Sequence, residues 1–176
     1  MLQIMASFLG SCIKRRNLMR KLEDLSYKDA LTHLGNRFAL GKYAEQVDKD
    51  QSIGVVYCDI TGLKYINDHE GHKAGDQLIL RASKCLEQAF ADYAVFRIGG
   101  DELLVLCPQI SEKTLEERIT VLQDLLKDAS VNMAVGVIWE EKATKALDEL
   151  LQESERLMYV DKERYYKEKG IQRRIY

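Results

Sequence analysis

Residues 52–60 (SIGVVYCDI) are an apolar run, rich in β-branched residues, that ends in the acid Asp59. Such a run is typical of a central strand that is buried on both faces. A helical pattern follows at 72–90, with a broad apolar stripe. The residues of that stripe are Leu78, Ile79, Ala82, Cys85, Leu86, Ala89 and Phe90. A buried strand followed by an amphipathic helix favours a sheet with helices packed on it.

The rest of the chain continues this alternation. Residues 94–98 and 103–107 predict two short strands joined by a Gly-Gly-Asp-Glu turn, where glycine can take positive φ. A further strand is expected at 131–139. Helices are expected before, between and after these strands. Their apolar positions are Phe38, Tyr43, Ala44 and Val47 in the first, Leu115, Ile119, Leu122 and Leu126 in the second, and Leu147, Leu150, Leu151, Leu157 and Met158 in the last. The pattern predicts an α/β (α+β) fold for residues 29–176 and excludes a transmembrane or purely helical one.

Composition agrees with one ordinary globular domain. The chain has 176 residues, of which 46% are hydrophobic and 31% charged. The formal charge of −2 and the lack of a basic stripe argue against a nucleic-acid partner. Four cysteines lack paired metal-ligand spacing, and Cys58, Cys85 and Cys107 read as core residues of a protein from a reducing compartment.

The N-terminal segment, residues 1–28, has a different character. Thirteen mostly apolar residues precede the basic run 14–16. This apolar stretch is shorter than the roughly 20 residues of a membrane span. Two interpretations remain open: the cytoplasmic end of a membrane helix, or an amphipathic or partner-binding helix. Leu18, Leu22 and Leu25 then form a short heptad-like seam, which either pairs with another copy or packs on its own domain.

Three charged clusters could carry chemistry. They are Asp59 at a strand end, Asp101 and Glu102 in the hairpin turn, and a basic group near the C-terminus formed by Lys162, Arg164 and Lys167. Mg²⁺ prefers hard oxygen ligands, accepts one or two protein carboxylates and takes further oxygens from substrate phosphates. A solvated turn is the alternative for the paired acids.

The segment after Asp59 has groups suited to a nucleotide. Gly62 lets the backbone approach a ligand and offer N–H groups to phosphate, and Lys64 could neutralise charge. Asn67 and Asp76 have the functional groups that read a guanine edge. Asp76 could instead simply favour a helix start. His69 and His72 have no third partner that would indicate zinc.

Together these clusters resemble the GGDEF family of diguanylate cyclases. DALTHLGNR (29–37) resembles its opening D-x-L-T-G-L-x-N-R, and DITGLKYINDHEGHKAGDQLIL (59–80) resembles its D-x-D-x-F-K-x-x-N-D-x-x-G-H-x-x-G-D-x-x-L segment. RIGGDEL (97–103) resembles the signature R-x-G-G-D/E-E-F. AVGV (134–137) and ESERLMYVDK (153–162) resemble the family's later motifs. The motifs run in the family's order from residue 29 to about 170.

The resemblance implies a nucleotidyl-cyclase-like palm, with a central, mostly antiparallel five-stranded sheet surrounded by helices. It implies condensation of two GTP into cyclic di-GMP with release of two pyrophosphates, using Mg²⁺ or Mn²⁺, two ions per active site. Asp59 and Asp101 would hold the metals with the Ile60 carbonyl, and Glu102 would complete the metal site or help deprotonate the attacking 3′-hydroxyl. GTP would be bound by Asn67 and Asp76 at guanine, by the Gly62 and Leu63 amides at phosphate, and by Lys64 and Lys162 at the triphosphate charge. Two domains must face each other, so a homodimer is expected.

The sequence departs from the family at several positions. His33 replaces a glycine, Thr61 replaces the second acid of D-x-D, and Leu63 and Leu103 replace phenylalanines. Tyr166 stands where a phosphate-binding arginine is frequent, and Arg164 or Lys167 could substitute. The inhibitory R-x-x-D has FADY (90–93) in its place, so no product inhibition through that site is expected.

Three functions follow from these observations. An active diguanylate cyclase is favoured because Asp59, Asp101 and Glu102 are all present. A catalytically silent GGDEF-like module that binds GTP or acts as a dimeric scaffold is the main alternative, and an enzyme that makes another cyclic product is a third. The expected location is cytoplasmic. The sequence leaves open whether the chain is the cytoplasmic domain of a membrane-anchored protein, with a tether or sensory domain N-terminal to it.

Overall fold

The structure is a computed structural model that describes Arg15 and residues 27–168. The expected N-terminal segment, residues 1–28, therefore lies almost wholly outside the described residues, as do its leucine seam and Cys12. Within the described part, Cys58, Cys85 and Cys107 are buried free thiols, which confirms them as core residues.

A single five-stranded sheet forms the centre of the described part, in the order β1-β3-β4-β2-β5. Its short edge strand β1 runs parallel to β3, and all other neighbours are antiparallel, which confirms the mostly antiparallel sheet. Every residue of β2 is buried, as the apolar run predicted. The strands are β1 (Gly35–Asn36), β2 (Ile53–Ile60), β3 (Ala94–Arg97), β4 (Glu102–Pro108) and β5 (Met133–Glu140).

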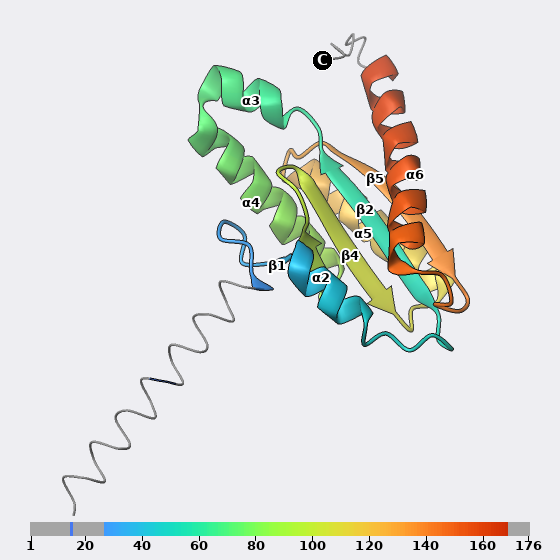
Figure 1. Ribbon diagram of the computed structural model, residues 1–176. Helices are drawn as coiled ribbons and strands as arrows, with labels where there is room; N and C mark the ends of the chain where they lie inside the picture. Colours follow the sequence, from blue (N-terminus) through green and yellow to red (C-terminus); the bar gives the residue numbers. More distant parts are fainter. Residues whose placement is uncertain (1–14, 16–26, 169–176) are drawn as a thin grey trace, which may run out of the picture.

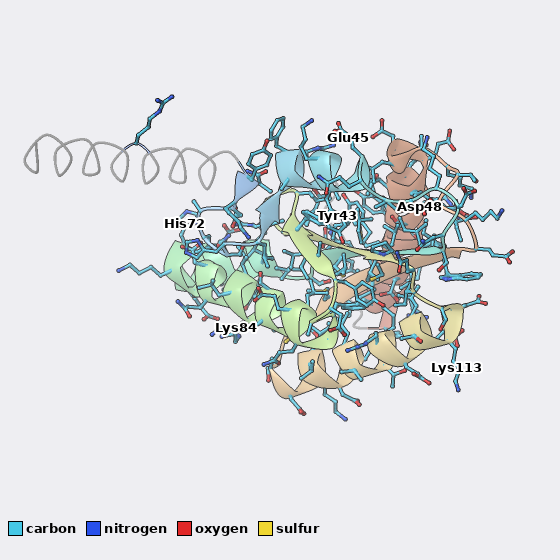
Figure 2. All side chains as sticks on the ribbon, turned by 90° about the horizontal axis from the view of Figure 1, so that it is seen from below. Tyr43, Glu45, Asp48, His72, Lys84 and Lys113 are labelled. Atoms are coloured by element: carbon cyan, nitrogen blue, oxygen red, sulfur yellow. The ribbon has the colours of Figure 1, made fainter. Side chains whose placement is uncertain are left out.

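Helices cover both faces of this sheet (Figure 1). On one face α4 and α5 pack on the apolar side chains of β2 and β4, and on the other face α2 and α6 do so. Figure 2, seen from below, shows the two layers at opposite sides of the strands. The helices are α2 (Arg37–Ala44), α3 (Leu63–Glu70), α4 (His72–Ala89), α5 (Glu112–Asp128) and α6 (Leu147–Glu168).

Helix α6 lies unusually close to β5, and Gly136 makes this possible. A Cβ atom at Gly136 would lie 2.0 Å from the Ser154 carbonyl oxygen and 2.4 Å from the Met158 backbone nitrogen. No side chain fits in that space, so glycine fixes the seat of α6, which here means the position of this helix against β5. This seat determines where the C-terminal half of α6 reaches the strand ends.

One expectation about the first helix is wrong. Phe38 was expected on the buried face, but it is 56% exposed and its ring lies beside Tyr27, with 5.2 Å between ring centroids. The buried residue of α2 is Leu40. Asn36 caps the helix by accepting hydrogen bonds from the backbone N–H groups of Phe38 and Ala39. Leu40 lies two residues after Phe38 and so on the opposite side of the helix.

Candidate functional site

The acids expected to act together lie at one end of two adjacent strands. Asp59, near the end of β2, is the register partner of Glu102, which begins β4. Asp101 precedes Glu102, and its carbonyl oxygen accepts a hydrogen bond of 2.9 Å from the Ile60 N–H. Asp59 is 5% exposed, whereas Asp101 and Glu102 are half-buried. The fold therefore brings the three carboxylates to the same end of the sheet.

Lys162 reaches this end of the sheet from α6. Its Nζ atom lies 2.6 Å from Oδ2 of Asp59, in an ion pair whose side chains are 14% and 7% exposed. Burial raises the pKa of Asp59. Lys162 opposes this shift with its hydrogen bond and charge, while the negative charges of Asp101 and Glu102 add to it. Lysine and carboxylate are thus coupled across 103 residues of sequence.

The other oxygen of Asp59, Oδ1, is buried and has no hydrogen-bond partner among the described residues. An unpaired buried carboxylate oxygen is costly unless something binds it. No group of three carboxylate, imidazole or thiolate side chains suited to a metal exists within Arg15 and residues 27–168. Mg²⁺, however, takes one or two protein carboxylates and completes its shell with water and phosphate oxygens. Asp59 and Glu102 fit that requirement.

Glu102 is held by a residue that the sequence did not single out. The Tyr57 hydroxyl donates a hydrogen bond of 3.0 Å to Oε1 of Glu102. Burial, and then the negative charge of Glu102, raise the pKa of Tyr57 well above its ordinary value, so the phenol stays protonated as a donor. Tyr57 lies two residues before Asp59 and therefore on the same face of β2, which is the one signal that the sequence offered.

The signature turn between β3 and β4 is fixed from the side of β1. Arg97 donates to the Gly100 carbonyl at 2.8 Å and pairs with Asp29 at 3.0 Å. Burial tends to raise the pKa of Asp29, but hydrogen bonds from Thr32 and Arg97 outweigh it and the pKa is lowered. The expected positive φ is wrong for this turn: the glycines of the described chain with positive φ are Gly62 and Gly71.

Gly99 leaves space in this turn for the Glu102 side chain. A Cβ atom there would lie 2.2 Å from Oε2 of Glu102 and 3.1 Å from its Cδ. The carboxylate of Glu102 therefore occupies the volume in which any larger residue would place its side chain.

The segment expected to bind a nucleotide starts directly after β2. Gly62 has φ 84°, in the left-handed region that favours glycine, and precedes the first turn of α3. Leu63 is half-buried and Lys64 exposed. Thr61 is 5% exposed, and its hydroxyl has no partner among the described residues. Its backbone N–H donates to the Asn132 carbonyl at 2.9 Å, so the exit from β2 is tied to the start of β5.

Asn67 and Asp76 lie on the two helices of the α3–α4 hairpin. Asn67 packs its amide against Gly75, where a Cβ atom would lie 2.0 Å from Oδ1. Asp76 follows Gly75 and is exposed. The hairpin rises above the same end of the sheet as the C-terminal half of α6 (Figure 1). The two residues expected at guanine are thus adjacent, beyond the strand ends that carry the acids.

The departures from the family pattern have defined surroundings. His33 has φ 59° and so takes the left-handed conformation that the family's glycine would adopt easily. Leu103 is fully buried. Tyr166 is half-buried beside Tyr165, with 5.6 Å between ring centroids. Arg164, a candidate for phosphate binding, forms an ion pair with Asp161 instead.

Asp161 also protects the edge of the sheet. Its Oδ2 atom accepts a hydrogen bond of 2.9 Å from the Val135 N–H on the outer side of β5.

In the part of the chain that the structure describes, no helix has both the length and the apolar composition of a membrane span.

The shape of the chain is similar to solved GGDEF structures. The coiled coil and GGDEF domain of DgcB from Caulobacter crescentus, solved in complex with c-di-GMP, aligns with a TM-score of 0.78 at 18% identity. That alignment covers 90% of this chain and 92% of DgcB's. At this identity the likeness concerns the fold.

Curated relatives are similar in sequence. The bifunctional diguanylate cyclase/cyclic di-GMP phosphodiesterase MucR of Pseudomonas aeruginosa is 31% identical over 135 residues, which is 73% of this chain and 19% of MucR. The probable diguanylate cyclase DgcJ of Escherichia coli is 31% identical over 146 residues, which is 77% of this chain and 29% of DgcJ. The chain thus spans less than a third of the length of either relative.

The model of the family described as diguanylate cyclase, GGDEF domain, matches residues 26–167. This range contains every strand and nearly every helical residue of the described structure. The chain belongs to the GGDEF family.

Proposed function

We propose that this chain is a diguanylate cyclase domain that condenses two GTP into cyclic di-GMP and two pyrophosphates. One observation carries the proposal: Asp59 has a buried, unpaired carboxylate oxygen beside Glu102, at the strand end from which the α3–α4 hairpin emerges. A cluster of carboxylates next to backbone N–H groups and a lysine suits a metal-bound triphosphate.

Four residues would hold the metal. Asp59, Asp101 and Glu102 supply carboxylates, and Ile60 supplies its carbonyl oxygen. Mg²⁺ or Mn²⁺, two ions per site, would lower the pKa of the 3′-hydroxyl and stabilise charge on the α-phosphate and pyrophosphate when bound. Thr61 makes the site one carboxylate poorer than the family pattern, and its buried hydroxyl offers an oxygen in that place.

The nucleotide would be bound by two further sets of groups. Asp76 accepts N–H groups of guanine, and Asn67 pairs with N3 or O6. The triphosphate lies against the Gly62 and Leu63 amides, with Lys64 and Lys162 balancing its charge. Lys162 is suited to this role because its ammonium group already lies beside Asp59, at the strand ends that carry the acids.

The reaction needs two facing domains. The 3′-oxygen of one GTP attacks the α-phosphorus of the other, an O–P bond forms, and pyrophosphate leaves. Glu102 would help remove the 3′-hydroxyl proton. The same step in the opposite direction closes the ring, so a homodimer with one GTP per domain is required. We place the domain in the cytoplasm, with residues 1–28 as its lead-in to a membrane tether or sensory part.

Product analysis tests the proposal. The protein is incubated with GTP and Mg²⁺, and nucleotides are separated and identified by mass. We expect cyclic di-GMP with two pyrophosphates per product. Glu102→Gln should abolish turnover and leave the circular dichroism spectrum unchanged. Glu116→Gln, on the exposed side of α5, should leave turnover unchanged. A folded dimer that binds GTP without product would favour the silent module, and another cyclic nucleotide would favour the third function.

Product inhibition through the usual site is not expected. Phe90 is fully buried in place of the arginine, and Tyr93 stands in place of the aspartate. The nearby Arg118 already binds the Ala89 carbonyl at 3.1 Å and Asp92 at 2.9 Å. A cyclic di-GMP titration that revealed tight binding away from the catalytic acids would contradict this expectation.

A further inference from the structure

We infer that Tyr57 is a positioning residue for Glu102: its hydroxyl fixes the carboxylate in the orientation in which it can bind the metal. The inference deepens the proposed function and rests on it for the role of Glu102. The contact itself is a hydrogen bond of 3.0 Å from Tyr57 to Glu102 and does not depend on that role.

The strand register explains how the two residues meet. Tyr57 pairs across the ladder with Leu104, and Asp59 pairs with Glu102. Residues two apart on a strand share a face, so Tyr57 and Asp59 on β2 lie on the same face as Glu102 and Leu104 on β4. The Tyr57 ring therefore crosses diagonally to Glu102, and its hydroxyl ends 3.0 Å from Oε1.

Burial makes this contact durable. Tyr57 is 6% exposed and belongs to the apolar cluster that α6 covers. A buried phenol needs an acceptor, and moving it to another would leave a polar group unpaired. The packing of the ring thus determines where the hydroxyl points, and the hydroxyl determines where Oε1 lies.

Gly99 leaves room for the second oxygen of the same carboxylate. A Cβ atom at this position would lie 2.2 Å from Oε2 of Glu102, so Oε2 occupies the space beside the turn backbone that glycine leaves open. Oε1 accepts the hydrogen bond from Tyr57. The Tyr57 hydroxyl is therefore the group to which we assign the orientation of this carboxylate.

This arrangement matches how metal-binding carboxylates are supported in other proteins. An outer hydrogen-bond donor orients the ligand, and its loss typically weakens metal affinity or activity by about 10- to 100-fold. A purely structural role for the hydroxyl would be satisfied by any acceptor. Here the acceptor is a carboxylate proposed for the metal, directly across the ladder from Asp59, whose Oδ1 has no hydrogen-bond partner among the described residues.

Binding of Mn²⁺ alone, measured by the EPR signal of the free ion, tests the inference without turnover. Tyr57→Phe keeps the ring and removes the donor, and should weaken Mn²⁺ binding about tenfold. Tyr43→Phe, which removes the hydroxyl of a half-buried tyrosine packed on Phe96, should leave Mn²⁺ binding unchanged. Equal affinity of wild type and Tyr57→Phe would overturn the inference.

A double-mutant cycle separates positioning from general loss of structure. Glu102→Asp keeps a carboxylate but shortens it beyond the reach of the hydroxyl. In that background Tyr57→Phe should change Mn²⁺ affinity by less than about twofold. The same tenfold loss in both backgrounds would show that the tyrosine acts through the fold and would refute the inference.

Turnover then tests the proposed function separately. In Tyr57→Phe, kcat should fall about tenfold while KM for GTP stays nearly constant, because the nucleotide groups are untouched. A rise in KM with unchanged kcat would overturn the assignment. If no variant and no wild-type protein makes cyclic di-GMP but the Mn²⁺ cycle holds, the cyclase proposal fails and the positioning of Glu102 stands.

Discussion

Two regions of the candidate site differ in how they are packed. One lies where α6 meets the sheet, next to the apolar core, and contains Asp59, Glu102 and Lys162. The other is the α3–α4 hairpin with Asn67 and Asp76, whose first helix, α3, has no buried residue. The two ends of the proposed GTP site are therefore built differently. At the acid end, each functional group is also a partner in the fold. At the hairpin end, Asp76 is exposed and can change without cost to packing. Substitutions should accordingly separate into those that alter stability and those that alter binding alone.

The seat of α6 gives the largest expected effect on the free energy of unfolding. Gly136→Ala forces a methyl group into the α6 backbone and should cost about 3 kcal/mol, measured by urea unfolding. Gly41→Ala is the matched control, because nothing lies within 4 Å of its added carbon, and alanine in a helix should be neutral or stabilising. Equal effects of the two substitutions would disprove the close seat of α6.

The buried ion pair should rank second. Lys162→Met leaves the Asp59 carboxylate buried without its partner and should cost about 2 kcal/mol. Adding Asp59→Asn removes the stranded charge, so the double variant should recover most of that loss in the same urea measurement. If the double variant is as unstable as the sum of the single ones, the pair does not couple the two residues.

The Asp29–Arg97 pair at the signature turn should rank third, with a defined pH dependence. The pKa of Asp29 is lowered below 3.8 on folding, so its stabilisation is present above that value and is lost as pH falls through the folded pKa. Asp29→Asn should cost about 1 kcal/mol at pH 7 and progressively less below about pH 4. Asp92→Asn, at a more exposed ion pair, should show little effect at any pH. A constant difference across pH would contradict the charge pairing.

The hairpin end should show the smallest effect on stability. Asp76→Ala should change the unfolding free energy by less than about 0.5 kcal/mol, because the side chain is exposed. GTP affinity, measured by calorimetry with Mg²⁺, should nevertheless fall at least about tenfold because charge-assisted hydrogen bonds are lost. Asp68→Ala, at an exposed acid on the neighbouring helix α3, should change neither quantity. Unchanged affinity in Asp76→Ala would remove this residue from the proposed guanine site.

The same division explains what could be predicted from the sequence. The burial of β2 and the apolar face of α4 follow from local patterns, and both expectations are confirmed. Local pattern failed for Phe38, whose ring lies beside Tyr27 outside the core while Leu40 takes the buried position of α2. It also gave no helix for α3, which has no buried stripe to detect.

The connections within the acid end lay beyond sequence reasoning. The bond between Tyr57 and Glu102 joins residues 45 apart, and it depends on strand register. The pairing of Lys162 with Asp59 depends on how closely α6 can approach β5, which Gly136 decides. A family motif names the acids but gives no account of the groups that hold them.

The hydrogen bond from the Val135 N–H to Asp161 bears on how two copies of the chain can associate. An unprotected edge strand invites pairing with the edge of another molecule and leads to aggregates or unproductive dimers. Asp161 occupies a donor of β5, and its ion pair with Arg164 places charge along that edge. A protein whose proposed reaction needs two domains face to face thus discourages their joining edge to edge. Correct assembly depends on the associations that a surface prevents as well as on those that it favours.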